Sequence, residues 1–120
     1  MSTPILSSHQ DGVLTLTLNR PTRKNALTLS MYEELAGALN TSAVDPKVRV
    51  VVITGAGRVF TSGNDLQDFM RSPPRSPDTP VFYFLKALLD FPKPLIAAID
   101  GPAIGIGTTM LLHCDFAYAT

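Results

Sequence analysis

The chain has 120 residues, of which 45% are hydrophobic and 17% are charged, so it can form one domain with a sizeable core but not two domains. Its ten basic and ten acidic side chains give a formal net charge of zero, which argues against nucleic acid or a membrane surface as the main partner. No apolar run approaches the ~20 residues of a membrane-spanning helix, so we expect a soluble protein.

A hairpin and a helix are the first predicted elements. Asp11-Gly12 is a strong turn signal, and apolar and hydroxyl residues alternate after it, which predicts a β-hairpin over residues 5–18. A polar, basic loop comes next. Ser30 and Glu33 then have the spacing of a capping box, so we expect a helix that begins at Ser30 and ends between residues 40 and 45.

Two strands and a second helix follow. The run of mostly β-branched residues over 48–54 and the apolar run over 95–99 are typical of strands that are buried on both faces. Between these runs, Thr79 and Pro80 have the pattern of a helix N-cap and first helical residue. We therefore expect a helix from Pro80 to about Asp90, which the prolines after it terminate.

Shorter segments complete the pattern. We expect a short helix over residues 65–70, a proline-rich surface loop over 71–78, another short helix over 107–113 and a last strand over 115–120. The alternation of strands and helices predicts an α/β fold with crossover helices and parallel strand pairing. Because the sequence stops at an apolar strand, we expect residues 1–120 to be the N-terminal part of a single, longer domain.

Two glycine-bearing turns are the main candidates for chemistry. Residues 60–66 follow the first apolar run, and residues 101–107 follow the second. Glycine permits backbone conformations that other residues avoid, and the N–H groups at a helix start are unpaired and carry partial positive charge. Two such turns at strand ends can direct N–H groups at one developing negative oxygen, as an oxyanion hole does.

The glycines at positions 55 and 57 have a simpler explanation. Gly55 and Gly57 follow a predicted strand, which is one part of a dinucleotide-binding motif. The third glycine of that motif is absent, since Phe60 stands at its position, and no helical pattern starts at Gly57. We expect a tight turn here.

Three motifs together resemble the crotonase superfamily of enoyl-CoA hydratases and isomerases. They are Asn19-Arg20-Pro21 with Asn25-Ala26-Leu27, then Phe60-Thr61-Ser62-Gly63-Asn64-Asp65-Leu66, then residues 93–105, in the family's order and spacing. The forms of the two turns are most similar to those of the Δ3,Δ2-enoyl-CoA isomerases. The resemblance implies a crotonase-type spiral of β-β-α units, truncated here before its C-terminal helical region, and it implies acyl-CoA thioesters as substrates with no permanently bound cofactor and no metal.

The resemblance also assigns roles to residues. The backbone N–H groups of Asn64 and Ile106 would hold the thioester oxygen and stabilise an enolate. Lys24, with the backbone of Ala26 and Leu27, would lie near the nucleotide end of coenzyme A; Arg20 and Arg23 belong to the same basic cluster but are weaker candidates for cofactor contact. The remaining residues expected to line the substrate site are Ser62, Gly63, Asp65, Leu66 and Gly105.

No residue near the turns has the character of a general base. Family hydratases carry a glutamate at the position of Thr109, which disfavours hydration, and the isomerases use a carboxylate beyond the strand that ends this sequence. Helix capping explains Glu33 and Glu34, and Asp65 is interpreted as an N-terminal helix anchor. Because loss of a general base commonly costs 10²–10⁴ in rate, we expect the 120-residue chain to be nearly inactive alone.

Other functions stay open. The chain could be a catalytically inactive fragment that binds acyl-CoA or associates with full-length subunits, or it could belong to a hydratase, a thioester hydrolase or a dehalogenase of the same superfamily. The resemblance implies a homotrimer for the full-length protein. Cys114, the single cysteine, is interpreted as a buried apolar residue in a reducing compartment. We therefore expect an intracellular location, cytoplasmic in a bacterium and otherwise peroxisomal or mitochondrial.

Overall fold

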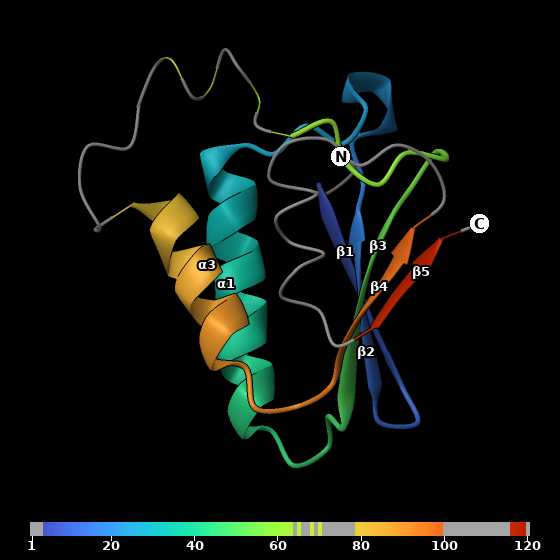
Figure 1. Ribbon diagram of the computed structural model, residues 1–120, viewed down its shortest axis with the longest axis vertical. Coiled ribbons are helices and arrows are strands. Elements are labelled where there is room, and N and C mark those ends of the chain that lie inside the picture. Colours follow the sequence, from blue (N-terminus) through green and yellow to red (C-terminus); the bar gives the residue numbers. More distant parts are fainter. Residues whose placement is uncertain are drawn as a thin grey trace.

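The structure is a computed structural model that describes residues 4–63, 65, 68, 70 and 79–99, together with the backbone of residues 116–119. Within these residues the chain forms a five-stranded sheet and two α-helices (Figure 1). The elements in chain order are β1 (Ile5–Gln10), β2 (Val13–Leu18), a 3₁₀ turn (Pro21–Arg23), α1 (Leu29–Val44), β3 (Val50–Gly55), α3 (Pro80–Asp90), β4 (Leu95–Ile99) and β5 (Phe116–Ala119).

The strands lie in the sheet in the order of the sequence. β1 and β2 form the antiparallel hairpin that the Asp11-Gly12 signal predicts, and each later strand pairs in parallel with the one before it. α1 and α3 pack against each other on one side of the sheet (Figure 1). The prediction of an α/β fold with crossover helices and parallel pairing is confirmed.

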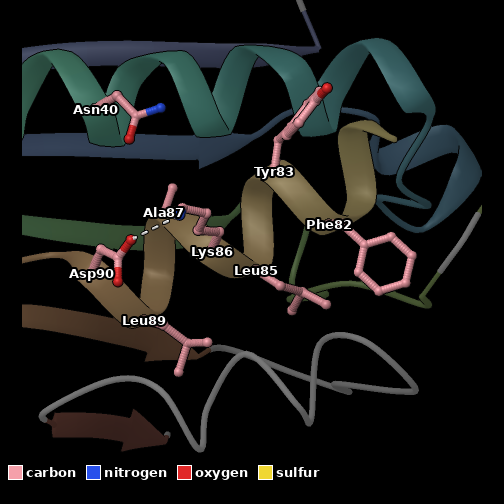
Figure 2. A pocket seen from close by; sticks show the side chains of 8 residues that line it. All are labelled: Asn40, Phe82, Tyr83, Leu85, Lys86, Ala87, Leu89 and Asp90. Carbon is pink, nitrogen blue, oxygen red and sulfur yellow. Dashed lines mark ion pairs between the residues drawn. The ribbon is translucent and has the colours of Figure 1, made fainter. Parts of the chain in front are cut away.

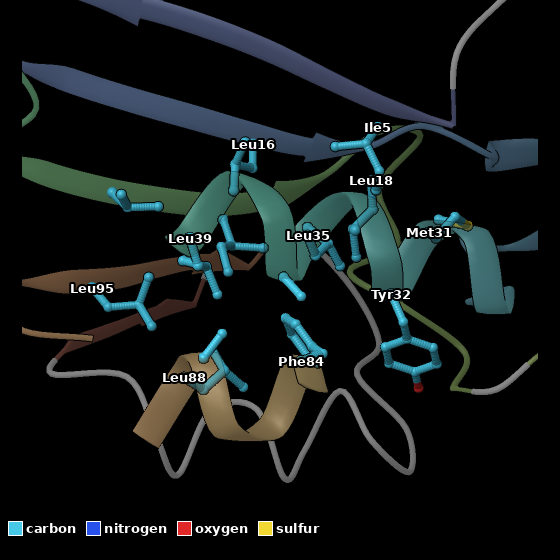
Figure 3. Close-up of a cluster of buried hydrophobic side chains, with 14 of the residues drawn as sticks. Ile5, Leu16, Leu18, Met31, Tyr32, Leu35, Leu39, Phe84, Leu88 and Leu95 are labelled. Carbon is cyan, nitrogen blue, oxygen red and sulfur yellow. The ribbon is translucent and has the colours of Figure 1, made fainter. Parts of the chain in front are cut away.

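The core lies between the sheet and the two helices. Leu16, Ile53 and Ala97 are partners in the register of β2, β3 and β4, and all three are fully buried. Figure 3 shows side chains of the sheet gathered with those of α1 and α3. The members from the helices include Met31, Tyr32, Leu35, Leu39, Phe84 and Leu88.

The expectation that two strands are buried on both faces is wrong. Along β3 and β4 buried and half-buried residues alternate, with Val52 and Ile96 on the half-buried face. The physical reason is that both described helices cover the same face of the sheet (Figure 1). β3 also begins two residues later than the apolar run does, at Val50.

The predicted start of the first helix is also wrong. The N-cap is Thr28 rather than Ser30: the Thr28 side chain accepts a hydrogen bond from the Met31 N–H at 3.2 Å. The Leu29 N–H, another donor without a partner inside the helix, donates to the Asp68 carboxylate at 2.6 Å. Because the helix starts earlier, Glu33 and Glu34 lie beyond its first turn and are exposed, so capping does not explain them.

The structure tests some of the predictions for residues after β3, and the others lie outside the described residues. α3 runs from Pro80 to Asp90 with Thr79 as its N-cap, as predicted, although the Thr79 side chain makes no capping hydrogen bond. Asp68 and Met70 are helical, as predicted for the helix over residues 65–70, whereas Asp65 is not. The loop over 71–78, the helix over 107–113 and Cys114 lie outside the described residues.

Lys93 ties the end of α1 to the start of β4. Its ammonium group donates to the backbone carbonyls of Ser42, Asp45 and Val48, each at 2.6 Å. The last carbonyls of a helix have no partner inside the helix and carry partial negative charge. A lysine has three donors, and all three are used here to join α1, β4 and the segment that leads into β3.

We predict that Lys93→Met destabilises the chain by ~2 kcal/mol, because three carbonyls lose a charged donor. Lys93→Arg should not restore the loss, since a planar guanidinium cannot converge on three acceptors as an ammonium does. Urea unfolding measures both effects. Lys86→Met is the matched control because Lys86 makes only an exposed ion pair at 3.9 Å, and an equal loss in this control would contradict the role of Lys93.

Candidate functional site

Two segments predicted to bind substrate lie side by side, residues 24–27 after β2 and residues 62–65 after β3. The Ser62 N–H donates to the Lys24 carbonyl at 3.0 Å, and the Leu27 N–H donates to the Gly63 carbonyl at 2.8 Å. The Leu27 carbonyl accepts from the Asp65 N–H, also at 2.8 Å. The two segments therefore form a short ladder of parallel type.

Asn25 fixes the first segment. Its side chain is fully buried and accepts from the Arg20 N–H at 2.7 Å, while its amide donates to the carbonyls of Ala56 and Val59, each at 2.8 Å. The Asn25 carbonyl accepts from the Thr61 hydroxyl at 2.7 Å. Asn25 therefore has a structural role, and its side-chain donors are both occupied by the protein.

The segment after β3 is a tight turn, as expected for the Gly55–Gly57 pair. Gly57 and Arg58 have φ angles of +72° and +62°, and no helix starts at Gly57 in the described chain. A Cβ on Gly57 would lie 2.6 Å from a side-chain atom of Pro21. The turn thus packs against the loop that follows β2.

Arg20 crosses between the two segments. Its guanidinium donates to the Ala26 carbonyl at 2.6 Å and to the Asp65 carboxylate at 3.2 Å. Only 22% of the Arg20 side chain and 9% of the Asp65 side chain are exposed. Arg23 and Lys24 are exposed, so these two residues offer more accessible positive charge to a ligand than Arg20 does.

Asp65 is held in its ionised form. One carboxylate oxygen accepts from the Asp68 N–H at 3.0 Å and the other accepts from Arg20. These contacts, the Asp68 N–H first, lower the pKa of Asp65 below its usual value against the opposing effect of burial. A carboxylate with a lowered pKa and both oxygens engaged is a poor general base, and these contacts agree with the interpretation of Asp65 as a helix anchor.

Six of the predicted site residues are described, and the ladder brings them together: Lys24, Ala26, Leu27, Ser62, Gly63 and Asp65. Gly63 is buried with a φ angle of +95°, a conformation that favours glycine. The other four, Asn64, Leu66, Gly105 and Ile106, lie outside the described residues, as does Thr109.

Sequence reasoning missed the role of Asp68. The spacing from Asp65 to Asp68 is that of an N-cap and the third helical residue, and this signal could have predicted the hydrogen bond between them. The contact from Asp68 to the Leu29 N–H spans 39 residues. No local sequence pattern predicts this contact.

Grooves on the described surface include two that differ in chemistry. One has a volume of about 690 Å³ and is lined by Pro4, Asn19, Arg20, Pro21, Thr22 and Arg23, beside the exposed basic residues. The other, of about 790 Å³, lies along α3, and Figure 2 shows Phe82, Leu85 and Leu89 on that helix. Its charged residues, Lys86 and Asp90, pair with each other. This second groove therefore offers apolar contact rather than reactive groups.

Neither a metal-binding group nor a membrane-spanning helix is found within the described residues. No group of three or more His, Cys, Asp and Glu side chains could bind a metal ion there. Of the described helices, none is both long enough and apolar enough to cross a membrane.

Comparison with known proteins adds independent findings. The sequence model of the enoyl-CoA hydratase/isomerase family matches residues 8–120. The chain is 38% identical to enoyl-CoA delta isomerase 2 of Rattus norvegicus, over 97% of this chain and 31% of that protein. It is 39% identical to 2,3-dehydroadipyl-CoA hydratase of Escherichia coli, over 96% of this chain and 46% of that protein.

A solved structure agrees with these matches. OdaA of Pseudomonas aeruginosa has a TM-score of 0.94 and 53% identity, over 98% of this chain and 48% of that chain. The chain thus spans between about a third and a half of the length of the proteins that it matches. The fold prediction and the family resemblance are confirmed.

We predict that Asp65→Asn lowers the free energy of unfolding by about 1–2 kcal/mol at pH 7, because hydrogen bonds to a charged group are lost. The pKa of Asp65 is lowered in the folded state. Its stabilisation is therefore complete above the unfolded pKa of about 3.9 and is lost as the pH falls through the lower, folded pKa.

Thermal unfolding of the wild type and of Asp65→Asn between pH 7 and pH 2 tests this pH dependence. The difference in Tm should be constant down to about pH 4 and shrink below it. A difference that stays constant to the acid limit would show that the carboxylate charge plays no part.

Proposed function

Since the chain belongs to the enoyl-CoA hydratase/isomerase family, we propose that it provides the thioester-binding part of an enoyl-CoA isomerase site. The carbonyl oxygen of a 3-enoyl-CoA accepts hydrogen bonds from the backbone N–H groups of Asn64 and Ile106. These donors stabilise the enolate that forms when the α-proton leaves, and the proton returns at the γ-carbon to give the 2-trans product. Each such donor can contribute ~3–4 kcal/mol in the transition state.

The observation that carries this proposal is the hydrogen bond from the Leu27 N–H to the Gly63 carbonyl, at 2.8 Å. The carbonyl of Gly63 and the N–H of Asn64 belong to one peptide group, and in a trans peptide the two point in opposite directions. The proposal therefore places the Asn64 N–H on the side of the turn opposite Leu27. In the proposal it donates there to the thioester oxygen.

Coenzyme A would bind along the first segment. Its phosphates are polyanionic, and Arg23 and Lys24 are exposed beside the ladder. In the proposal, Lys24 and the backbone of Ala26 and Leu27 contact the nucleotide end. Ser62 and Gly63, with Leu66 and Gly105, line the path to the thioester.

The choice of isomerase over hydratase rests on the missing base. Threonine at position 109 cannot remove a proton near neutral pH, so the hydratase mechanism with two glutamates is disfavoured. Asp65 and Asp68 are occupied by structural hydrogen bonds. In the proposal, the carboxylate that moves the proton comes from another part of the whole protein, which acts as a homotrimer in the cytoplasm, a peroxisome or a mitochondrion.

We predict that Lys24→Gln weakens butyryl-CoA binding by about two- to fivefold, which is the usual size of an exposed ionic contact. The affinity of this variant should also depend less on salt than that of the wild type, because one ionic contact is gone. Isothermal calorimetry measures both. Lys86→Gln, on α3, serves as the control, and equal losses in the two variants would contradict a specific contact at Lys24.

We also predict that the 120-residue chain isomerises a 3-enoyl-CoA at least 10²-fold more slowly than a site with a general base, a factor typical of base removal. The ultraviolet absorbance of the conjugated product follows the reaction. Any turnover should raise the absorbance from a 3-enoyl-CoA rather than lower it from a 2-enoyl-CoA, which hydration would do. Loss of absorbance from the 2-enoyl-CoA would favour a hydratase.

A further inference from the structure

We propose that Arg20 and Asp65 are positioning residues: their ion pair fixes the direction of the thioester-binding N–H that follows Gly63. This inference rests on the function proposed above. We assign both side chains a role inside the protein, because both Asp65 oxygens and the two terminal nitrogens of Arg20 form hydrogen bonds within the chain. Their effect on the ligand would come through the backbone of the turn.

The first step is that Arg20 binds both segments of the ladder at once. One guanidinium nitrogen donates to the Ala26 carbonyl at 2.6 Å, next to Leu27 in the first segment. The other donates to Asp65 at 3.2 Å, in the second segment. Because a guanidinium is planar and rigid, its two nitrogens set the spacing between the acceptors that they bind.

The second step is that Asp65 is fixed from the opposite direction as well. Its other oxygen accepts from the Asp68 N–H at 3.0 Å. Asp68 in turn accepts from the Leu29 N–H at 2.6 Å, at the start of α1. The carboxylate is thus held between the loop after β2 and a residue that is anchored to a helix.

The third step is that Gly63 and Asp65, the residues on either side of position 64, are both held by hydrogen bonds. The Gly63 carbonyl is held by Leu27, and Asp65 is held by Arg20, Asp68 and the Leu27 carbonyl. Rotation of the Gly63 carbonyl would break its hydrogen bond to Leu27, and the proposal is that the ion pair of Asp65 adds to this restraint. Backbone hydrogen bonds contribute only about 1 kcal/mol each, so the ladder alone is a weak restraint, and the half-buried ion pair strengthens it.

A pair of ligands separates this role from a general effect on stability. Butyryl-CoA and S-butyl-CoA differ only in the carbonyl oxygen that the N–H groups would bind. In the wild type we expect butyryl-CoA to bind about tenfold more tightly, the value of one or two neutral hydrogen bonds. Calorimetry with both ligands gives this thioester preference directly.

Two variants test the positioning role. Asp65→Asn keeps the size of the side chain and removes its charge, while Arg20→Lys keeps the charge and removes the fork. Each should reduce the thioester preference to about twofold or less, and the affinity for S-butyl-CoA should change by less than about twofold. The double variant should lose no more of the thioester preference than either single variant, because both substitutions disrupt the same ion pair.

Asp90→Asn is the matched control. It removes a carboxylate from the exposed ion pair with Lys86 on α3, which has a separation of 3.9 Å. The affinities for both ligands should be unchanged. Thermal unfolding of each variant shows that it is folded at the temperature of the binding measurement, and the two chemically different variants guard against the failure of one to fold.

The outcomes are distinct. If the wild type shows no thioester preference, the proposed function is overturned, and the positioning role with it. If the wild type shows the preference and both variants retain it, only the positioning role is overturned. Equal losses for the two ligands would also overturn it, since they would indicate that Arg20 and Asp65 merely keep the loops folded.

Discussion

The buried side chain of Asn25 is the contact on which the candidate site depends. Two of its three side-chain hydrogen bonds join the loop that follows β2 to the turn that follows β3, and the third holds the loop itself together. A buried amide that loses its partners costs about 1–3 kcal/mol for each group left unsatisfied, so this arrangement is strongly preferred. With Asn25 in place, the neighbouring backbone is aligned for the ladder to residues 62–65, and Arg20 is directed toward Asp65.

The topology explains why these loops meet. β2 and β3 are parallel neighbours, so the segments that leave their carboxyl ends emerge at the same edge of the sheet. The site is thus built from backbone groups of two loops rather than from reactive side chains. Such an arrangement suits the proposed chemistry, because backbone donors that are fixed in advance can stabilise negative charge without reorganisation.

Helix α1 connects the site to the rest of the fold. Its first N–H groups are satisfied by Thr28 and by Asp68, and carbonyls at its other end accept from Lys93. Both ends are therefore held by residues that are distant in the sequence. Since Asp68 also donates to Asp65, the helix and the turn form one connected unit, which gives the backbone of the site a rigid support.

Local chemistry was enough to predict the hairpin at Asp11-Gly12, the bounds of α3 and the turn at Gly57, because the conformation of each depends on its nearest neighbours. The motifs also indicated the two segments that form the candidate site, whose role in binding stays a prediction. The tertiary structure alone decided where α1 begins and which basic residues are exposed to a ligand. Arg20 and Arg23 look alike in the sequence, but within the described residues it is Arg20 that forms an ion pair, through a contact that spans 45 residues. Long-range pairing and burial depend on how distant segments pack, and no local pattern encodes that.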